Sequence, residues 1–196
     1  LSRIRRIDIS QNGYYFGGYF QGNLYFSIDT ITSYSAAYDT YVYKTDFNGN
    51  GQWVRRIRGQ KAENFKTIAT DEYDNVYILG NSNSNTLYVD STAELTNPHT
   101  RTASINYDTY IGKYNRSGYL QWFLRIGGNG KDIYNDFVLR NNVIYATGYF
   151  AGQLIFNQDT ISTSDTTNED AFLAALNQIG DPIAGVSITG TGKYQD

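Results

Sequence analysis

The chain consists of short stretches in which apolar and polar residues alternate, separated by turns rich in Gly and Asn. Alternation with a period of two indicates β-strands, because successive side chains of a strand point to opposite faces. Four such stretches follow one another in a fixed order, and this order occurs three times. They are residues 4–9, 14–18, 40–44 and 52–57, then 65–70, 76–80, 109–113 and 121–126, then 134–139, 144–148, 171–175 and 183–188. The pattern predicts three units of four antiparallel strands.

Two short motifs recur in step with these strands. The first is found as Asp39-Thr40-Tyr41, Asp108-Thr109-Tyr110 and Asp170-Ala171-Phe172, and the second as small-residue pairs ending at Gly59, Gly128 and Gly190. Successive pairs are 69 and 62 residues apart. A period of this length is typical of an array of similar modules. We therefore expect units at 1–59, 60–128 and 129–190, with 191–196 as the start of a following unit or a tail.

The fourth strand of the first unit is bulky on both faces. Its two alternating sets of side chains are Trp53, Arg55 and Ile57, and Val54, Arg56 and Arg58. A sheet packed between two neighbouring sheets needs large side chains on both faces, whereas a sheet of an immunoglobulin-like sandwich has one wet face. A β-helix is disfavoured because its coils repeat in roughly 20 to 25 residues. We expect an all-β fold, a β-propeller of three four-stranded antiparallel blades.

Three blades are too few to close, since single-ring propellers have roughly four to eight. Two blade faces would stay bare, and each large apolar side chain left in water forgoes about 1.5–3 kcal/mol. We expect the blades to be part of a larger ring, completed by further repeats of the same polypeptide or by a second copy of the chain. The ends of the sequence carry no capping segment, which favours further repeats.

Composition narrows the kinds of site that the chain can hold. Its 19 Tyr, 10 Phe and 19 Gly favour strands and tight turns over helices. The absence of Cys excludes disulfides, thiolate metal sites and a Cys nucleophile. A formal charge of −3 gives no general attraction for a phosphate backbone, and no apolar run is long enough to cross a bilayer. We expect neither nucleic-acid binding nor membrane insertion.

Longer motifs resemble a known repeat. Residues 71–80 combine a D-x-x-x-N turn with Val-Tyr-Ile-Leu-Gly, and residues 39–50 lead into Gln-Trp and a small-residue pair. This order is similar to the seven-bladed β-propeller repeat of the bacterial SBBP type. The resemblance implies a propeller fold and an extracytoplasmic scaffold or binding role, and it carries over no catalytic residue. The third unit departs from the motif at Ala175, Ile183 and Ala184, so looser packing is expected there.

Candidate partner-binding residues lie mainly in the connection between the second and third strands, where the units differ most. Such loops tolerate insertions and often carry binding surfaces. This connection is longest in the second unit, where it includes residues 90–107. The candidates are His99, Tyr34, Tyr38, Asn83, Asn85 and Tyr107. Tyr and Asn suit protein partners and could also stack on and hydrogen-bond a sugar. An outer-rim loop without a partner has the same composition.

A calcium site has one weak candidate. Asp46, Asn48 and Asn50 fit the opening of a calcium-binding loop, but Ile57 stands where a bidentate Glu would be. A Gly/Asn hairpin turn explains the same residues. We therefore expect no bound metal or other cofactor.

The recurrent acids Asp39, Asp108 and Asp170 are expected to be structural. Equivalent positions of successive blades do not converge on one substrate, so these carboxylates are expected to accept backbone hydrogen bonds. A single His leaves no His-rich metal cluster and no Ser/His/Asp set. No catalytic residue is predicted.

These observations favour a non-enzymatic scaffold or binding module. We expect it to mediate protein–protein contacts in a cell-surface, secreted or particle-surface assembly, with other protein subunits or further repeats of the same chain as partners. The alternatives are a carbohydrate-binding, lectin-like propeller and, third, a propeller enzyme that acts on glycans. The expected location is extracellular or at the cell surface, with a virion-associated protein as the alternative.

Overall fold

The computed structural model describes residues 1–90, 93–96, 107–128, 130–156, 159–163 and 168–188. Three groups of four strands carry the fold. They are β1 (Ser2–Ser10), β2 (Gly13–Phe20), β5 (Asp39–Thr45) and β6 (Gly51–Gly59) in unit 1, β7 (Glu63–Thr70), β8 (Val76–Ser82), β11 (Asp108–Tyr114) and β12 (Leu120–Ile126) in unit 2, and β13 (Asp132–Arg140), β14 (Val143–Phe150), β17 (Asp170–Asn177) and β18 (Pro182–Ile188) in unit 3. The twelve predicted strands all lie within these bounds, so the all-β class is confirmed.

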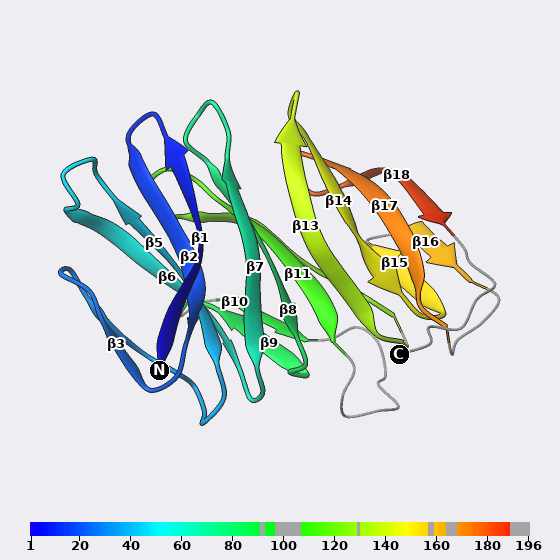
Figure 1. The fold of residues 1–196 in the computed structure, drawn as a ribbon, viewed down its shortest axis with the longest axis horizontal. Coiled ribbons are helices and arrows are strands. Elements are labelled where there is room, and N and C mark those ends of the chain that lie inside the picture. The colour runs from blue at the N-terminus through cyan, green and yellow to red at the C-terminus, as the bar shows by residue number, and fades with distance from the viewer. Residues whose placement is uncertain (91–92, 97–106, 129, 157–158, 164–167, 189–196) are drawn as a thin grey trace.

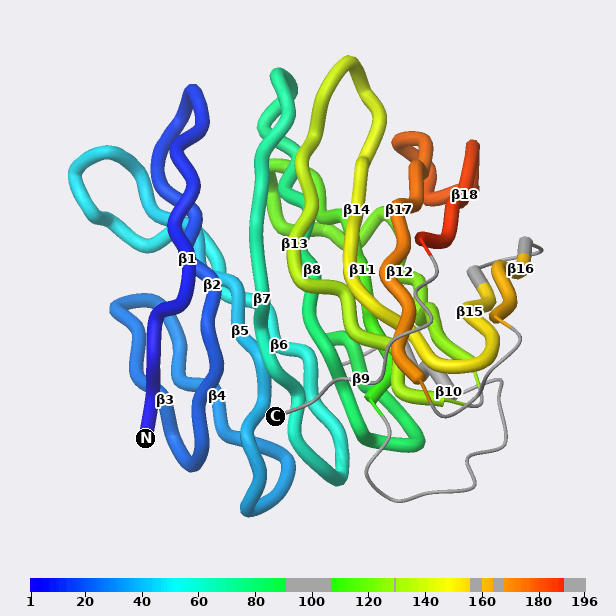
Figure 2. The backbone as a smooth tube through the Cα atoms, turned by 45° about the vertical axis from the view of Figure 1, so that its right-hand side comes forward, coloured from blue at the N-terminus to red at the C-terminus, as the bar shows by residue number. Residues whose placement is uncertain are grey.

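Within each unit the four strands form an antiparallel sheet in chain order, and the three sheets stack face to face (Figures 1 and 2). Tight turns join the first strand to the second and the third to the fourth, and Gly49, Gly118 and Gly180 take positive φ at the same place between the third and fourth strands. The described residues include no helix long and apolar enough to cross a membrane.

The connection between the second and third strands of each unit folds into a further hairpin, which the sequence did not predict. These hairpins are β3 (Asn23–Tyr25) with β4 (Thr30–Thr32), β9 (Thr86–Val89) with β10 (Ala93–Thr96), and β15 (Gln153–Phe156) with β16 (Asp159–Ser162). β9 also pairs with β6 of unit 1, with Ile57 opposite Val89. An antiparallel bridge between Gly127 and Ile155 is the corresponding contact one unit later. β9 and β10 thus extend the sheet of unit 1, whereas β15 and β16 form a separate sheet that meets unit 2 through this one bridge.

The first strands of the three units, β1, β7 and β13, lie next to one another on one side of the structure (Figure 1), which we call the axial side. Each of these strands has a β-bulge at the same place, which sets Arg5, Lys66 and Asn135 out of the ladder. A bulge bends its strand and redirects a side chain. The bulges therefore repeat along the axial side.

The hydrophobic core lies between the units. The cluster between units 1 and 2 includes Tyr15, Val42, Trp53, Ile57, Phe65, Ile68 and Tyr110. The cluster between units 2 and 3 includes Tyr77, Ile111, Ile126, Tyr134, Phe137, Phe150 and Phe172. Burying one such side chain contributes about 1.5–3 kcal/mol. Stability therefore depends on each unit having a neighbour.

Candidate interaction surfaces

A tryptophan on the last strand of one unit binds the final turn of the next unit. Trp53 donates its indole N–H to the carbonyl of Arg116 at 3.0 Å, and Trp122 donates to the carbonyl of Gln178 at 2.7 Å. Lys44 Nζ donates to the carbonyl of Arg116 as well, at 3.0 Å. The same contact thus recurs at both junctions between units.

Buried threonines connect the units near the start of their third strands. Thr40 Oγ1 lies 2.7 Å from the hydroxyl of Tyr110 in the next unit. Thr109 Oγ1 donates to Asn81 Oδ1 at 2.8 Å and accepts from the backbone N–H of Tyr134, again in the next unit, at 3.0 Å. Both threonines are fully buried, so each junction includes a polar contact of fixed geometry as well as apolar packing.

Two carboxyl groups meet at the junction between units 1 and 2. Asp39 and Glu63 are fully buried, and the pKa of each carboxyl depends on the charge of the other. Glu63 Oε1 accepts from the hydroxyls of Ser82 at 3.0 Å and Ser84 at 2.6 Å, while Asp39 Oδ2 accepts from the N–H of Tyr34 at 2.7 Å. Burial raises the pKa of Asp39 to about 6 and that of Glu63 to about 8. At neutral pH, burial therefore favours the protonated form of Glu63.

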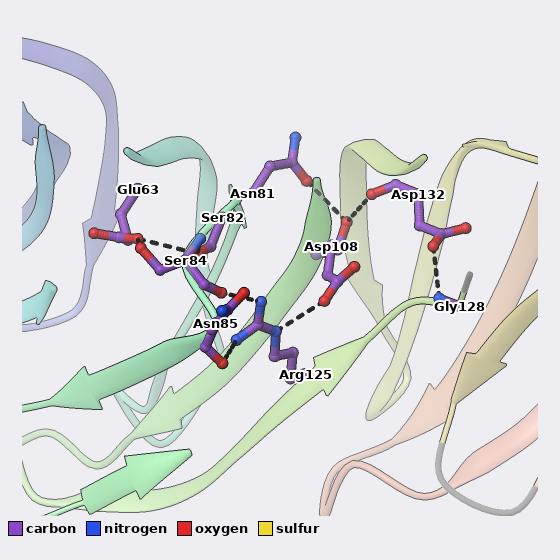
Figure 3. Close-up of polar contacts among 10 residues, drawn as sticks. Glu63, Asn81, Ser82, Ser84, Asn85, Asp108, Arg125, Gly128 and Asp132 are labelled. Carbon is purple, nitrogen blue, oxygen red and sulfur yellow. Dashed lines mark hydrogen bonds and ion pairs between the residues drawn. The ribbon is translucent and has the colours of Figure 1, made fainter. Parts of the chain in front are cut away.

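The junction between units 2 and 3 pairs its carboxylates differently (Figure 3). Asp108 Oδ2 accepts from Nε of Arg125 at 2.9 Å, and both side chains are almost fully buried. Arg125 also donates to the carbonyl of Asn85 at 3.0 Å. Asp132 Oδ2 accepts from the N–H of Gly128 at 2.6 Å. A guanidinium and a backbone amide thus supply the donors at this junction.

The sequence predicted that the recurrent acids accept backbone hydrogen bonds. This is confirmed for Asp39, and Asp108 accepts a hydrogen bond from a guanidinium. The sequence did not single out Glu63 and Asp132, the acids of the neighbouring first strands. Both acids stand at the first residue of equivalent strands, β7 and β13, and this recurrence is the sequence signal that could have identified them.

The outer face of unit 3 exposes positions that are buried in the other units. By strand register, Tyr145, Leu173 and Ile188 correspond to Tyr15, Val42 and Ile57 of unit 1. The three residues of unit 1 are fully buried against unit 2, while their counterparts are 40%, 46% and 66% exposed. Unit 3 therefore presents the apolar face with which unit 1 binds unit 2.

The opposite face of unit 1 is bare in the same way. Ile4 and Ile7 are 63% and 54% exposed, although their counterparts Phe65 and Ile68 are buried. A groove of about 870 Å³ opens on this face, with an aromatic lining that includes Tyr14, Phe16, Phe26, Tyr41, Tyr43 and Phe47. The two end faces are thus the two halves of an inter-unit junction.

The predicted partner-binding residues that the structure describes make different contacts. Tyr34 packs against Tyr88, with ring centroids 5.4 Å apart, and the guanidinium of Arg58 lies 5.2 Å from the centre of each ring. These contacts fasten β9 to unit 1. Asn83 Oδ1 accepts from the N–H of Ala62 at 2.9 Å. Asn85 is exposed, and its backbone carbonyl accepts a hydrogen bond from the Arg125 guanidinium.

Tyr38 and Tyr107 occupy equivalent places at the two junctions. The carbonyl of Tyr38 accepts from the N–H of Glu63 at 2.8 Å, and the carbonyl of Tyr107 accepts from the N–H of Asp132 at 2.9 Å. The Tyr107 side chain also lines a pocket on the axial side. His99 lies outside the described residues. A partner-binding role for these six residues stays a prediction.

The calcium-loop residues form a hydrogen-bonded turn. Asp46 Oδ1 accepts from the N–H groups of Asn48 at 2.9 Å and Asn50 at 2.8 Å. Asn115 and Asn177 make the same pair of contacts in the other units, where a carboxylate is absent. The turn therefore does not require a metal ion. Among the described residues, no three His, Cys, Asp or Glu side chains gather as a metal site would need.

Comparison with known proteins agrees with this architecture. Residues 52–88 match the model of a beta-propeller repeat, SBBP. The match begins in the last strand of unit 1 and continues through β7 and β8 into β9, so it spans the junction between two units. An uncharacterized WD repeat-containing protein of Acanthamoeba polyphaga mimivirus is 28% identical over 167 residues, which cover 78% of this chain and 12% of that relative. The resemblance to the SBBP β-propeller repeat is thereby confirmed for residues 52–88.

Proposed function

We propose that this chain is a non-enzymatic β-propeller scaffold that assembles through its two end faces, each of which binds a blade of the same kind. Units 1 to 3 are three such blades of a larger ring. The partner blade belongs to a second copy of the chain or to further repeats of the same polypeptide.

The observation that carries the proposal is the correspondence between exposed and buried positions. Leu173 and Ile188 of unit 3, like Ile4 and Ile7 of unit 1, occupy positions that are buried at the junctions inside the structure. Contiguous apolar surface of this kind marks an interaction site. Because the faces are the two sides of one kind of junction, two copies are complementary head to tail.

The β3–β4 hairpin fits the same assembly. In unit 2 the corresponding hairpin adds to the last strand of unit 1, and in unit 3 Ile155 forms a bridge to Gly127, the residue after the last strand of unit 2. Among the described residues, β18 pairs with no strand other than β17, and β3 pairs with no strand other than β4. By analogy with the Ile57–Val89 pair, Ile188 of one blade would stand opposite Phe26 of the next.

Cysteine cross-linking tests this arrangement, because the chain has no Cys of its own. An Ile188→Cys protein is mixed with a Phe26→Cys protein under mild oxidation. Residues directly opposite in a ladder lie within the Cα separation that a disulfide allows, about 4.4–6.8 Å. We expect a disulfide-linked dimer. The control pairs Phe26→Cys with Ile179→Cys, which places an exposed Cys at the far turn of unit 3. Equal cross-linking of both pairs, or none above background, contradicts the proposal.

Glycan binding and glycan chemistry have no comparable support. The aromatic groove of unit 1 lies on the face that a neighbouring blade would cover, and the described carboxyl pairs are buried inside junctions. We propose an extracellular, cell-surface or virion-surface location on the repeat resemblance alone. A protein that is labelled neither on intact cells, nor in the culture medium, nor on intact virions would contradict it.

A further inference from the structure

We propose that the axial side binds a single oxyanion, the carboxylate or phosphate group of a ligand, in a pocket between the inner strands of the three units. The pocket has a volume of about 310 Å³, and its lining includes Arg5, Tyr19, Lys66, Lys131 and Tyr149. Three of its lining residues are cationic and none is a carboxylate. The volume is at the lower end of the range for small-molecule sites, about 300–1,000 Å³, and suits one small charged group.

The repeated β-bulge supplies the two inner cations. Arg5 and Lys66 occupy the same bulge position on β1 and β7, and both line the pocket. Asn135 occupies this position on β13 and does not line the pocket. All three units have the bulge, but only in units 1 and 2 is the bulged residue cationic. These two residues give the pocket its paired positive charge.

The two inner cations lack a counterion within the described part of the chain. Neither Arg5 nor Lys66 forms an ion pair there, while Lys131 at the rim is bonded to Glu169 at 2.8 Å. Burial lowers the pKa of Lys66, and the nearby charge of Arg5 lowers it further. An anion between the two side chains would relieve this repulsion and gain charge-assisted hydrogen bonds.

Aromatic rings hold the cations against the pocket wall. The Arg5 guanidinium lies 5.8 Å from the centre of the Tyr19 ring, and Lys131 Nζ lies 4.9 Å from the centre of the Tyr149 ring. A cation–π contact keeps the Arg5 guanidinium in place without neutralising it, whereas Lys131 is also paired with Glu169. The pocket is therefore arranged to receive negative charge from outside the chain.

Calorimetric titration with inorganic phosphate, and with acetate in a second arm, tests the site at constant ionic strength. We expect saturable binding of at least one probe, weakened about tenfold or more in Lys66→Gln and in Arg5→Gln. Preference for phosphate would identify a phosphate ligand, and preference for acetate a carboxylate. Arg6→Gln is the matched control, because it removes one charge from the same strand and Arg6 does not line the pocket. Its affinity should stay within about twofold.

A second measurement guards against variants that alter the fold. The Lys66 side-chain resonances, assigned from their loss in Lys66→Gln, should report a higher pKa for Lys66 when the anion is bound. No saturation by either probe, or equal weakening by Arg6→Gln, would overturn the proposal. An unchanged Lys66 pKa at saturation would overturn it as well.

Discussion

Loss of the proton from Glu63 should make the protein less stable as pH rises through neutrality. Its pKa is raised from an ordinary 4.5 to about 8 in the folded chain by burial. Between these values the folded state holds one proton more than the unfolded state. The free energy of unfolding should therefore fall by about 1.4 kcal/mol per pH unit, or roughly 2–3 kcal/mol from pH 6 to pH 8. Asp39, with a pKa raised to about 6, adds a loss of the same sign between about pH 4 and pH 6.

Replacing Glu63 with Gln separates this effect from other titrations. The carboxamide oxygen of Gln can accept from Ser82 and Ser84 as the acid does, and the carboxamide cannot ionise. We expect the variant to be nearly insensitive to pH from 6 to 8 and more stable than the parent at pH 8. Urea unfolding followed by Trp fluorescence at several pH values measures the slope.

Glu169→Gln is the control, because Glu169 lies in an exposed ion pair that contributes little to stability. It should keep the pH slope of the parent. A parent protein whose stability is flat from pH 6 to 8 would refute the reasoning, as would an unchanged slope in Glu63→Gln.

Three further substitutions test the junctions. Trp122→Phe removes the N–H donor to the carbonyl of Gln178 and should cost about 1–3 kcal/mol in urea unfolding; no loss would argue against the contact. Gly17→Ala places a methyl group against the Phe65 ring of the next unit and should lower the free energy of unfolding by about 1–3 kcal/mol. Adding Phe65→Leu should recover part of the stability that Gly17→Ala removes. If the stability losses of the two substitutions simply add, this packing is contradicted. Ala184→Trp gives unit 3 the tryptophan that Trp53 provides in unit 1, where it binds the final turn of the next unit. The substitution should lower the dissociation constant of self-association about tenfold in sedimentation velocity. An unchanged dissociation constant would contradict the proposed assembly.

The main strands were predictable because each carries a strong local signal. Runs such as Val76–Ser82 combine β-branched and aromatic residues with a clear boundary at Gly or Asn. The bulky residues Trp53 and Ile57 are buried against the next unit, as their spacing predicted. Position within a repeat was therefore a good guide to position in a sheet.

The added hairpins and the carboxyl pairs were not predictable by the same means. Strands of three or four residues, such as β3 and β9, are too short to show a period, and β9 is placed by pairing with a strand of another unit. The partner of Asp39 is likewise set by the way two units stack, since Glu63 lies 24 positions further along the chain. Contacts between units cannot be read from the local pattern of apolar and polar residues.

The strand addition by β9 makes the sheets overlap along the polypeptide. The sheet that begins at β1 is completed by residues that follow β8, so a cut after Gly59 would remove part of that sheet along with unit 2. Excising or exchanging one repeat therefore requires moving the next repeat's hairpin with it, and the boundary for engineering lies beyond residue 96. Such interleaving also means that neighbouring repeats should unfold together, because neither can separate without breaking backbone hydrogen bonds in both.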